Sequence, residues 1–158
     1  MFSRDGGLTG RPVSTSVLVV DDSRPDHFIS KRLIHRSWGQ DCEVVVAEDG
    51  GLAIDVLKAR AAQGLRPFDL VFLDVNMPRV DAWGFFELYG QLDPEAHADD
   101  IALMVTTELP AVVKRFAEAS PFISFFVSKP LDFDAIELHL KLCGAPFDPR
   151  RPARPRGL

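Results

Sequence analysis

The sequence predicts an α/β protein in which helices cover both faces of a parallel sheet. Five short apolar runs alternate with five segments of helical periodicity, and this alternation is typical of parallel sheets joined by right-handed crossovers. The runs Val17–Val20 and Leu70–Leu73 contain no polar residue, as expected of strands that are buried on both faces. Polar residues that follow the strands would gather at one sheet edge, where such folds bind ligands.

The first two strand–helix units follow directly from the residue pattern. Asp21 and Asp22 come after the first strand, and Pro25 suits the first turn of a helix over about residues 24–38. The valine-rich segment Glu43–Glu48 is the second expected strand. A helix follows Gly50–Gly51, with apolar residues at positions 52, 53, 56 and 57 on one face.

The third and fourth units are equally regular. The strand Leu70–Leu73 ends at Asp74, and the segment Phe85–Leu92 has apolar residues at i, i+3, i+4 and i+7, which predicts a helix. The strand Ile101–Val105 ends at Thr106. A fourth helix is expected between Pro110 and Pro121.

The last unit begins with the strand Ile123–Val127, which is followed by Lys129. Asp132 is the expected N-cap of the fifth helix, and Gly144 is its expected C-terminal stop.

Length and composition indicate one globular domain. The chain has 158 residues, of which 46% are hydrophobic and 26% charged, so it can bury a core without disulfides or metal. We expect a domain over residues 15–144, a flexible arm over residues 1–14, and an Arg/Pro-rich arm over residues 145–158. No membrane span or signal peptide is evident, which favours a cytoplasmic protein with reduced cysteines.

The strand ends combine into a possible reaction site. Asp21, Asp22 and Asp74 would bring three carboxylates together, and clustered carboxylates recruit a cation, for which all-oxygen ligands favour Mg²⁺. A phosphate group is the natural complement of such a site. An aspartate can form an acyl phosphate, while Lys129 neutralises phosphoryl oxygens and the Thr106 hydroxyl binds one of them.

Four motifs at these positions resemble the response-regulator receiver domain. They are VLVVDDS, LVFLDVNMP, MVTTE and FFVSKPL, and the resemblance covers Val17 to Leu142. The block WGFFELY with SKPL is most similar to small stand-alone, chemotaxis-regulator-like receivers. The resemblance implies a flavodoxin-like (βα)5 three-layer sandwich with strand order 2-1-3-4-5.

The resemblance also implies a phosphorylation and metal site. Asp74 matches the phosphorylated aspartate, Asp22 a direct Mg²⁺ ligand, and Asp21 the partner acid that acts through a metal-bound water. Asn76 matches the position that offers the metal its backbone carbonyl. The metal set is therefore Asp21, Asp22, Asp74 and Asn76.

The switch residues follow in the same way. Thr106 matches the switch hydroxyl, Lys129 the site lysine, and Pro130 the proline whose preceding peptide bond the family holds cis. Phe126 matches the aromatic residue whose rotamer couples to Thr106; it replaces the commoner tyrosine and cannot donate a hydrogen bond.

One loop departs from the family pattern. Ala82 stands where glycine usually follows the loop Asp81, and a positive φ there would cost about 1–2 kcal/mol. Gly84 is the alternative position for the bend.

We therefore expect a two-component response regulator that is not an enzyme. It would accept a phosphoryl group on Asp74 from a sensor histidine kinase or phosphotransfer protein and signal to a downstream protein target. Because 16 residues after Leu142 cannot form a DNA-binding unit, output through protein contacts is expected, with possible homodimerisation through the fourth helix, fifth strand and fifth helix.

Four alternatives remain. A haloacid-dehalogenase-type phosphohydrolase normally has a second acid where Asn76 stands. A phosphorylation-silent binding module is the second. In the third, Asp21 and Asp22 merely cap a helix. DNA binding through the arginine-rich arm is the fourth, although the net charge of −5, with both arms positive, disfavours a nucleic-acid surface on the domain body.

Overall fold

The computed structural model describes residues 15–75, 77, 80–105, 111, 114, 115, 118, 120–134 and 136. Within these residues the elements are β2 (Ser16–Val20), α1 (Arg24–Trp38), β3 (Glu43–Ala47), α2 (Gly50–Ala62), β4 (Leu70–Asp74), α3 (Ala82–Tyr89), the 3-10 turn η1 (Pro94–Ala96), β5 (Asp100–Val105) and β6 (Phe125–Ser128). None of the helices described is long and apolar enough to cross a bilayer.

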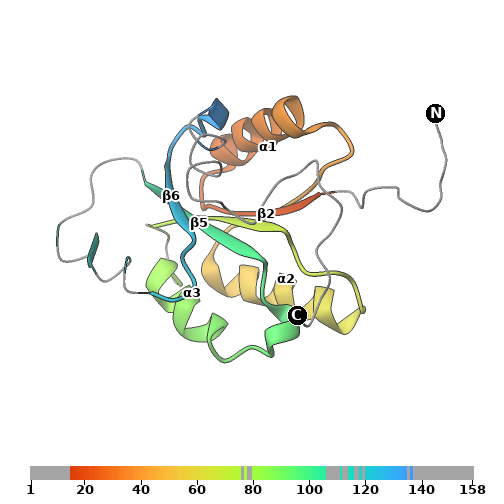
Figure 1. The fold of residues 1–158 in the computed structure, drawn as a ribbon, viewed down its shortest axis with the longest axis vertical. Coiled ribbons are helices and arrows are strands. Elements are labelled where there is room, and N and C mark those ends of the chain that lie inside the picture. Colours follow the sequence, from red (N-terminus) through yellow and green to blue (C-terminus); the bar gives the residue numbers. More distant parts are fainter. Residues whose placement is uncertain are drawn as a thin grey trace.

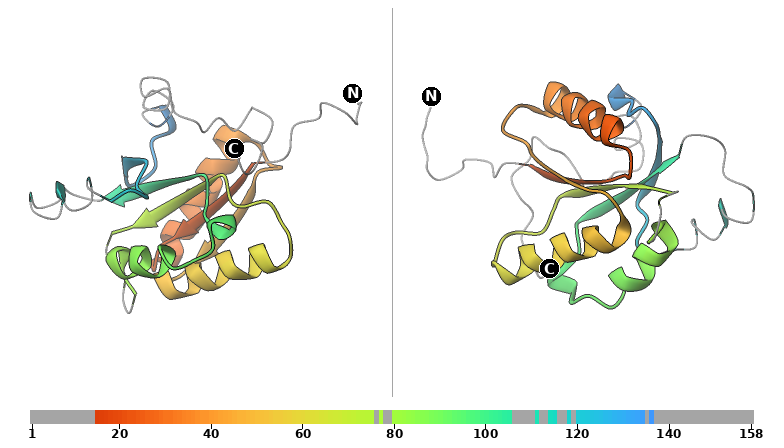
Figure 2. Two further views of the ribbon diagram at one scale, coloured as in Figure 1. Left: turned by 60° about the horizontal axis from the view of Figure 1, so that its bottom comes forward. Right: turned by 180° about the vertical axis from the view of Figure 1, so that it is seen from behind.

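The strands form one parallel sheet between helical layers. The order is β3-β2-β4-β5-β6, which is 2-1-3-4-5 along the chain and confirms the predicted flavodoxin-like topology. Helix α1 lies on one face of the sheet, and α2 and α3 lie on the other (Figure 1). The view from behind shows the same three layers (Figure 2).

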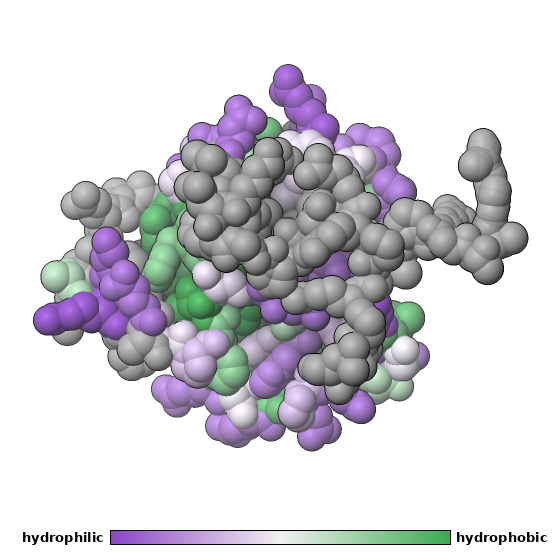
Figure 3. Space-filling view, viewed as in Figure 1, coloured by the Kyte–Doolittle hydropathy of each residue, from purple (hydrophilic) through white to green (hydrophobic). Residues whose placement is uncertain are grey.

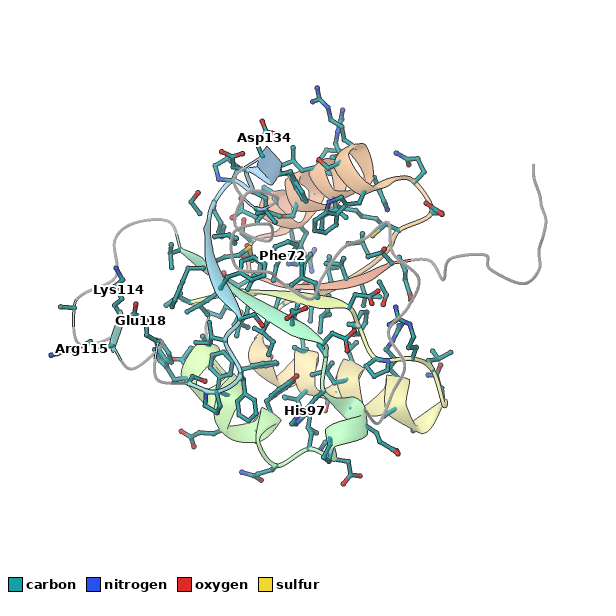
Figure 4. All side chains as sticks on the ribbon, in the orientation of Figure 1. Phe72, His97, Lys114, Arg115, Glu118 and Asp134 are labelled. Atoms are coloured by element: carbon teal, nitrogen blue, oxygen red, sulfur yellow. The ribbon has the colours of Figure 1, made fainter. Side chains whose placement is uncertain are left out.

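The two central strands are buried along their whole length, as their apolar runs predict. Side chains on the two faces pack into separate clusters. On the α1 face, Phe72 stacks on Trp38 with ring centroids 6.3 Å apart, and Figure 4 shows Phe72 on this side of the sheet. On the other face, Leu18 and Leu73 pack with Phe85 of α3.

Helices α1, α2 and α3 each start at a side-chain cap. The N–H group of Asp26 donates to the Ser23 hydroxyl in α1, that of Leu52 to the Asp49 carboxylate in α2, and that of Gly84 to the Asp81 carboxylate in α3. These caps supply acceptors for N–H groups that have no partner inside a helix. The predicted helix over residues 24–38 is confirmed.

The end of α3 differs from the prediction. The helix ends at Tyr89, three residues before Leu92, because Gly90 is a poor helix former. The N–H groups of Gln91 and Leu92 then bond carbonyls three residues back, at Leu88 and Tyr89, which is turn geometry.

The start of the last strand also differs. Strand β6 begins at Phe125, two residues after Ile123. Ahead of it, the Ser124 hydroxyl accepts the Ile101 N–H at 3.2 Å and donates to the Asp100 carboxylate at 3.1 Å. The Ser124 hydroxyl thus accepts the Ile101 N–H, which a backbone carbonyl would accept in a regular strand.

The structure describes only parts of the helices predicted near the C-terminus. The fourth and fifth helices fall mostly outside the described residues, as do Gly144 and the two arms. The carboxylate of Asp132 accepts the Asp134 N–H at 3.1 Å, which confirms Asp132 as an N-cap.

The loop that follows β4 is held by the start of α2. The Gly50 N–H donates to the Val80 carbonyl at 2.9 Å, and a Cβ on Gly50 would lie 2.7 Å from that carbonyl oxygen. Ala82 occupies the first helical position of α3, so the predicted φ > 0 strain is absent. The chain bends at Val80, and Asp81 is the extended N-cap of α3; the alternative bend at Gly84 is wrong because Gly84 is helical.

The close approach at Gly50 predicts that Gly50→Ala destabilises the protein. The expected loss is about 1–3 kcal/mol of unfolding free energy, because the new Cβ would press on backbone. The matched control is Gly51→Ala, whose Cβ would meet only side-chain atoms, none nearer than 3.3 Å; its effect should stay within about 1 kcal/mol. Urea unfolding measures both, and equal stabilities would refute the packing argument.

Candidate functional site

The candidate site lies at the carboxyl edge of the sheet, where β2 and β4 end side by side. Their register pairs Val20 with Leu73, so Asp21 and Asp74, the next residue in each strand direction, reach the same level. Carboxylate oxygens of Asp21, Asp22 and Asp74 all lie within 4.8 Å of one another. The sheet thus gathers the three predicted acids.

The three acids differ in exposure. Asp21 is fully buried and Asp74 is 7% exposed, whereas Asp22 is exposed. The Asp21 N–H donates to the Ala47 carbonyl, and its carboxylate accepts the Ser23 N–H, both at 3.0 Å. These bonds fix Asp21, while Asp22 leaves the site open to solvent.

The helix-cap interpretation of Asp21 and Asp22 is wrong. Ser23 is the N-cap of α1, and its hydroxyl accepts the helical N–H. Ser23 was not predicted as the N-cap because the two preceding aspartates are equally good capping residues.

Lys129 reaches the acids from the end of β6. Its backbone N–H donates to the Val105 carbonyl at 3.0 Å, which extends the pairing of β6 with β5. Its Nζ lies 2.8 Å from a carboxylate oxygen of Asp21, 2.9 Å from one of Asp26 and 3.7 Å from one of Asp74. One ammonium therefore stands between three carboxylates.

Asp26 is a member of this site that the sequence analysis missed. It lies in the first turn of α1, four residues past Asp22. Because α1 starts directly after the acid pair, a residue one turn into the helix stays at the same sheet edge. That spacing is the signal that could have identified it.

The charges of the site raise the pKa of Lys129. Burial by itself lowers this pKa, but hydrogen bonds to Asp21 and Asp26, with the negative charge of Asp74, outweigh burial and raise it above its ordinary value. The side chain is only 13% exposed, yet it remains an ammonium at neutral pH.

The structure describes some of the other predicted site residues and not others. The Lys129–Pro130 peptide bond is cis, as predicted. Phe126 is half-buried and packs against the core cluster on the α2 and α3 face, whereas Phe125 is plain core on the other face. Asn76 and Thr106 lie outside the described residues, so their roles stay predictions.

The described histidines are satisfied structural groups. The Nε2 atom of His27 contacts the Asp21 carbonyl, that of His35 the Cys42 carbonyl at 3.0 Å, and that of His97 the Tyr89 carbonyl at 2.9 Å. Each Nε2 donates, since a carbonyl oxygen only accepts. Figure 4 shows His97 on the α2 and α3 side of the sheet.

The donor set suits a hard divalent cation. Three carboxylates that can each offer one oxygen within a 4.8 Å cluster match the oxygen ligation that Mg²⁺ prefers, and the exposed Asp22 leaves room for the waters that Mg²⁺ retains. We find no thiol or imidazole in this cluster of described residues.

Comparison with known protein families gives a match over most of the chain. The family model described as response regulator receiver domain matches residues 17–141. No protein with a curated description matches the chain significantly.

Solved structures with a similar fold include three of note. A two component response regulator from Cytophaga hutchinsonii is 28% identical with a TM-score of 0.69, over 85% of this chain and 99% of that chain. A response regulator receiver protein from Dyadobacter fermentans is 27% identical with a TM-score of 0.69, over 84% and 99%. The receiver domain of an Arabidopsis thaliana histidine kinase, complexed with Mg²⁺, is 21% identical with a TM-score of 0.65, over 79% and 90%.

The raised pKa of Lys129 predicts a stability term that is lost in strong base. The pKa of Lys129 is higher in the folded state than in the unfolded state. The stabilisation from its ammonium is therefore fully present below the unfolded-state pKa of about 10.4, and it is lost as pH rises through the folded-state pKa. The difference in unfolding free energy between wild type and Lys129→Met should therefore be constant near neutral pH and shrink at high pH. The exposed Lys58 supplies the control, Lys58→Met, whose difference should stay near zero. A Lys129→Met difference that does not change with pH would contradict the assignment.

Proposed function

Because this chain belongs to the response regulator receiver domain family, we propose that Asp74 accepts a phosphoryl group from a phosphohistidine. The donor is a sensor histidine kinase or a phosphotransfer protein. The observation that carries the proposal is the convergence of Asp21, Asp22 and Lys129 on the Asp74 carboxylate. The protein is a phospho-acceptor in signalling, and at most it catalyses its own phosphorylation and dephosphorylation.

The transfer is a nucleophilic displacement at phosphorus. A carboxylate oxygen of Asp74 forms the new P–O bond, the P–N bond to the donor imidazole breaks, and its electron pair stays on that nitrogen. Lys129 lies close enough to place its positive charge beside the phosphoryl oxygens. Thr106, through its hydroxyl, is proposed to bind one of them.

Mg²⁺ is the proposed cofactor. Asp21, Asp22 and Asp74 would hold it through carboxylates, Asp21 by way of a water, and Asn76 through its backbone carbonyl. A Mg²⁺ ion held by these residues would supply positive charge to neutralise the phosphoryl oxygens. The Mg²⁺ complex of the Arabidopsis receiver domain, which has the same fold, supports this choice.

Protein contacts are the proposed output. The face formed by the fourth helix, β6 and the fifth helix would bind a downstream target or a second copy of the chain. Apolar residues gather on the side of the molecule where β6 lies, between polar surfaces over α1 and α2 (Figure 3). Phe126 of β6 is half-buried. A cytoplasmic location stays a prediction.

Phosphorylation of Asp74 is the central prediction. With Mg²⁺ and acetyl phosphate, the wild type should gain one phosphate that is labile to acid and base, detected by intact-protein mass spectrometry. Asp74→Asn should gain none, because the amide cannot form the acyl phosphate. Glu48→Gln, which removes an acid at the same sheet edge outside the cluster, should react normally. An unmodified wild type would refute the proposal and favour a phosphorylation-silent module, and turnover on a generic phosphate ester would instead favour a phosphohydrolase.

The metal assignment predicts a selective loss of Mg²⁺ binding. Asp22→Asn should weaken Mg²⁺ binding about tenfold or more, since mutating even a residue that only supports a metal ligand weakens metal binding by that factor. Glu48→Gln makes the same change in net charge and should alter the dissociation constant less than about twofold, because solvent screens charge outside the cluster. Isothermal titration calorimetry measures both. Equal losses in the two variants would mean that Asp22 is no ligand.

A further inference from the structure

Asp26 is held so that its carboxylate meets Lys129. Its backbone N–H donates to the Ser23 hydroxyl, which fixes it in the first turn of α1. Its carboxylate oxygen lies 2.9 Å from the Lys129 Nζ. This contact ties α1 to the segment that follows β6.

The ammonium is not centred on the phospho-acceptor. Its Nζ is within hydrogen-bond distance of Asp21 and Asp26 but 3.7 Å from Asp74, which is beyond that distance. A phosphoryl group on Asp74 would add negative charge and new acceptor oxygens beside Lys129. For Lys129 to bind those oxygens, at least one of its present contacts must lengthen.

The contact with Asp26 is the one that breaks more easily. Asp21 is fully buried, so losing the ammonium would leave a buried charge with reduced compensation. The Asp26 side chain is 36% exposed, so water can replace the ammonium there, and exposed ion pairs contribute little to stability.

We propose that Asp26 is a positioning residue: it holds Lys129 away from Asp74 in the resting state and releases it when Asp74 carries a phosphoryl group. The inference rests on the proposed phosphorylation of Asp74. Asp26 thereby sets how strongly the site favours the unphosphorylated form. The competing explanation is that Asp26 only anchors α1 to the end of β6.

The first experiment uses beryllofluoride, a tetrahedral analogue of the phosphoryl group, with saturating Mg²⁺. Asp26→Asn should bind it about fivefold more tightly than wild type, which is the upper end of the effect of a solvent-exposed ion pair. Asp26→Glu, which keeps the carboxylate, should return affinity to near the wild-type value. Glu48→Gln, with the same change in charge as Asp26→Asn, should change affinity less than about twofold.

The second experiment tests whether Asp26 acts through Lys129, with Mg²⁺ alone as the probe. In the wild-type background, Asp26→Asn should weaken Mg²⁺ binding severalfold, because the released ammonium moves onto Asp21 and Asp74 and competes with the metal. In a Lys129→Met background, Asp26→Asn should change the Mg²⁺ dissociation constant less than about twofold. Calorimetry gives the four dissociation constants of this cycle.

The outcomes separate the two proposals. A wild type that neither accepts phosphate nor binds beryllofluoride refutes the proposed function, while the Mg²⁺ cycle still tests the contact. A wild type that is phosphorylated, with Asp26→Asn no different from Glu48→Gln, refutes the role of Asp26. If Asp26→Asn still weakens Mg²⁺ affinity in the Lys129→Met background, the positioning role of Asp26 is also refuted. Asp26 then only anchors α1.

Discussion

The contact between the Lys129 ammonium and the carboxylates around it is the interaction on which the site depends. Asp21 is buried without exposed surface, and Asp74 is nearly so. A buried carboxylate is unfavourable unless it is paired and hydrogen-bonded. Asp21 meets both conditions through Lys129 and the Ser23 N–H. The ammonium therefore permits two acids to lie at the end of buried strands.

The parallel sheet explains why distant segments meet at this point. Parallel strands end at a common edge, and the register that pairs Val20 with Leu73 and Val105 with Ser128 brings their following residues to similar levels. Burial on both faces fixes that register, because a shift by one residue would reverse which side chains face each core cluster. Stability of the core and geometry of the site thus share one cause.

The sequence predicted the strands well because uninterrupted apolar runs have few alternatives in a protein of this size. Their order in the sheet was implied by the resemblance to the receiver domain, and the structure confirms it. The sequence predicted Asp21, Asp22, Asp74 and Lys129 as neighbours because each stands at a strand end. It missed Asp26, since that contact depends on how α1 crosses the sheet relative to the end of β6. Boundaries differed where a local group intervened, as with the Ser124 hydroxyl ahead of β6.

The departures from the family pattern have local physical explanations. Ala82 replaces the usual glycine without strain because it is the first helical residue of α3, and the chain bends at Val80, ahead of the N-cap Asp81. The loop between β4 and α3 is secured at both ends, by the Val75 N–H on the Met104 carbonyl and by the Gly50 N–H on the Val80 carbonyl. A glycine is still required at a close approach, but it lies in α2.

The second departure from the family pattern is Phe126, which stands where tyrosine is commoner. Phe126 lacks the hydroxyl of the commoner tyrosine, so it can sense its surroundings only through packing. It lies against the core cluster that also contains Leu103 and Leu73, and Leu73 directly precedes Asp74. Any coupling between the strand end and Phe126 would therefore be steric. Van der Waals contacts of this kind are sensitive to small displacements, because protein interiors are close-packed.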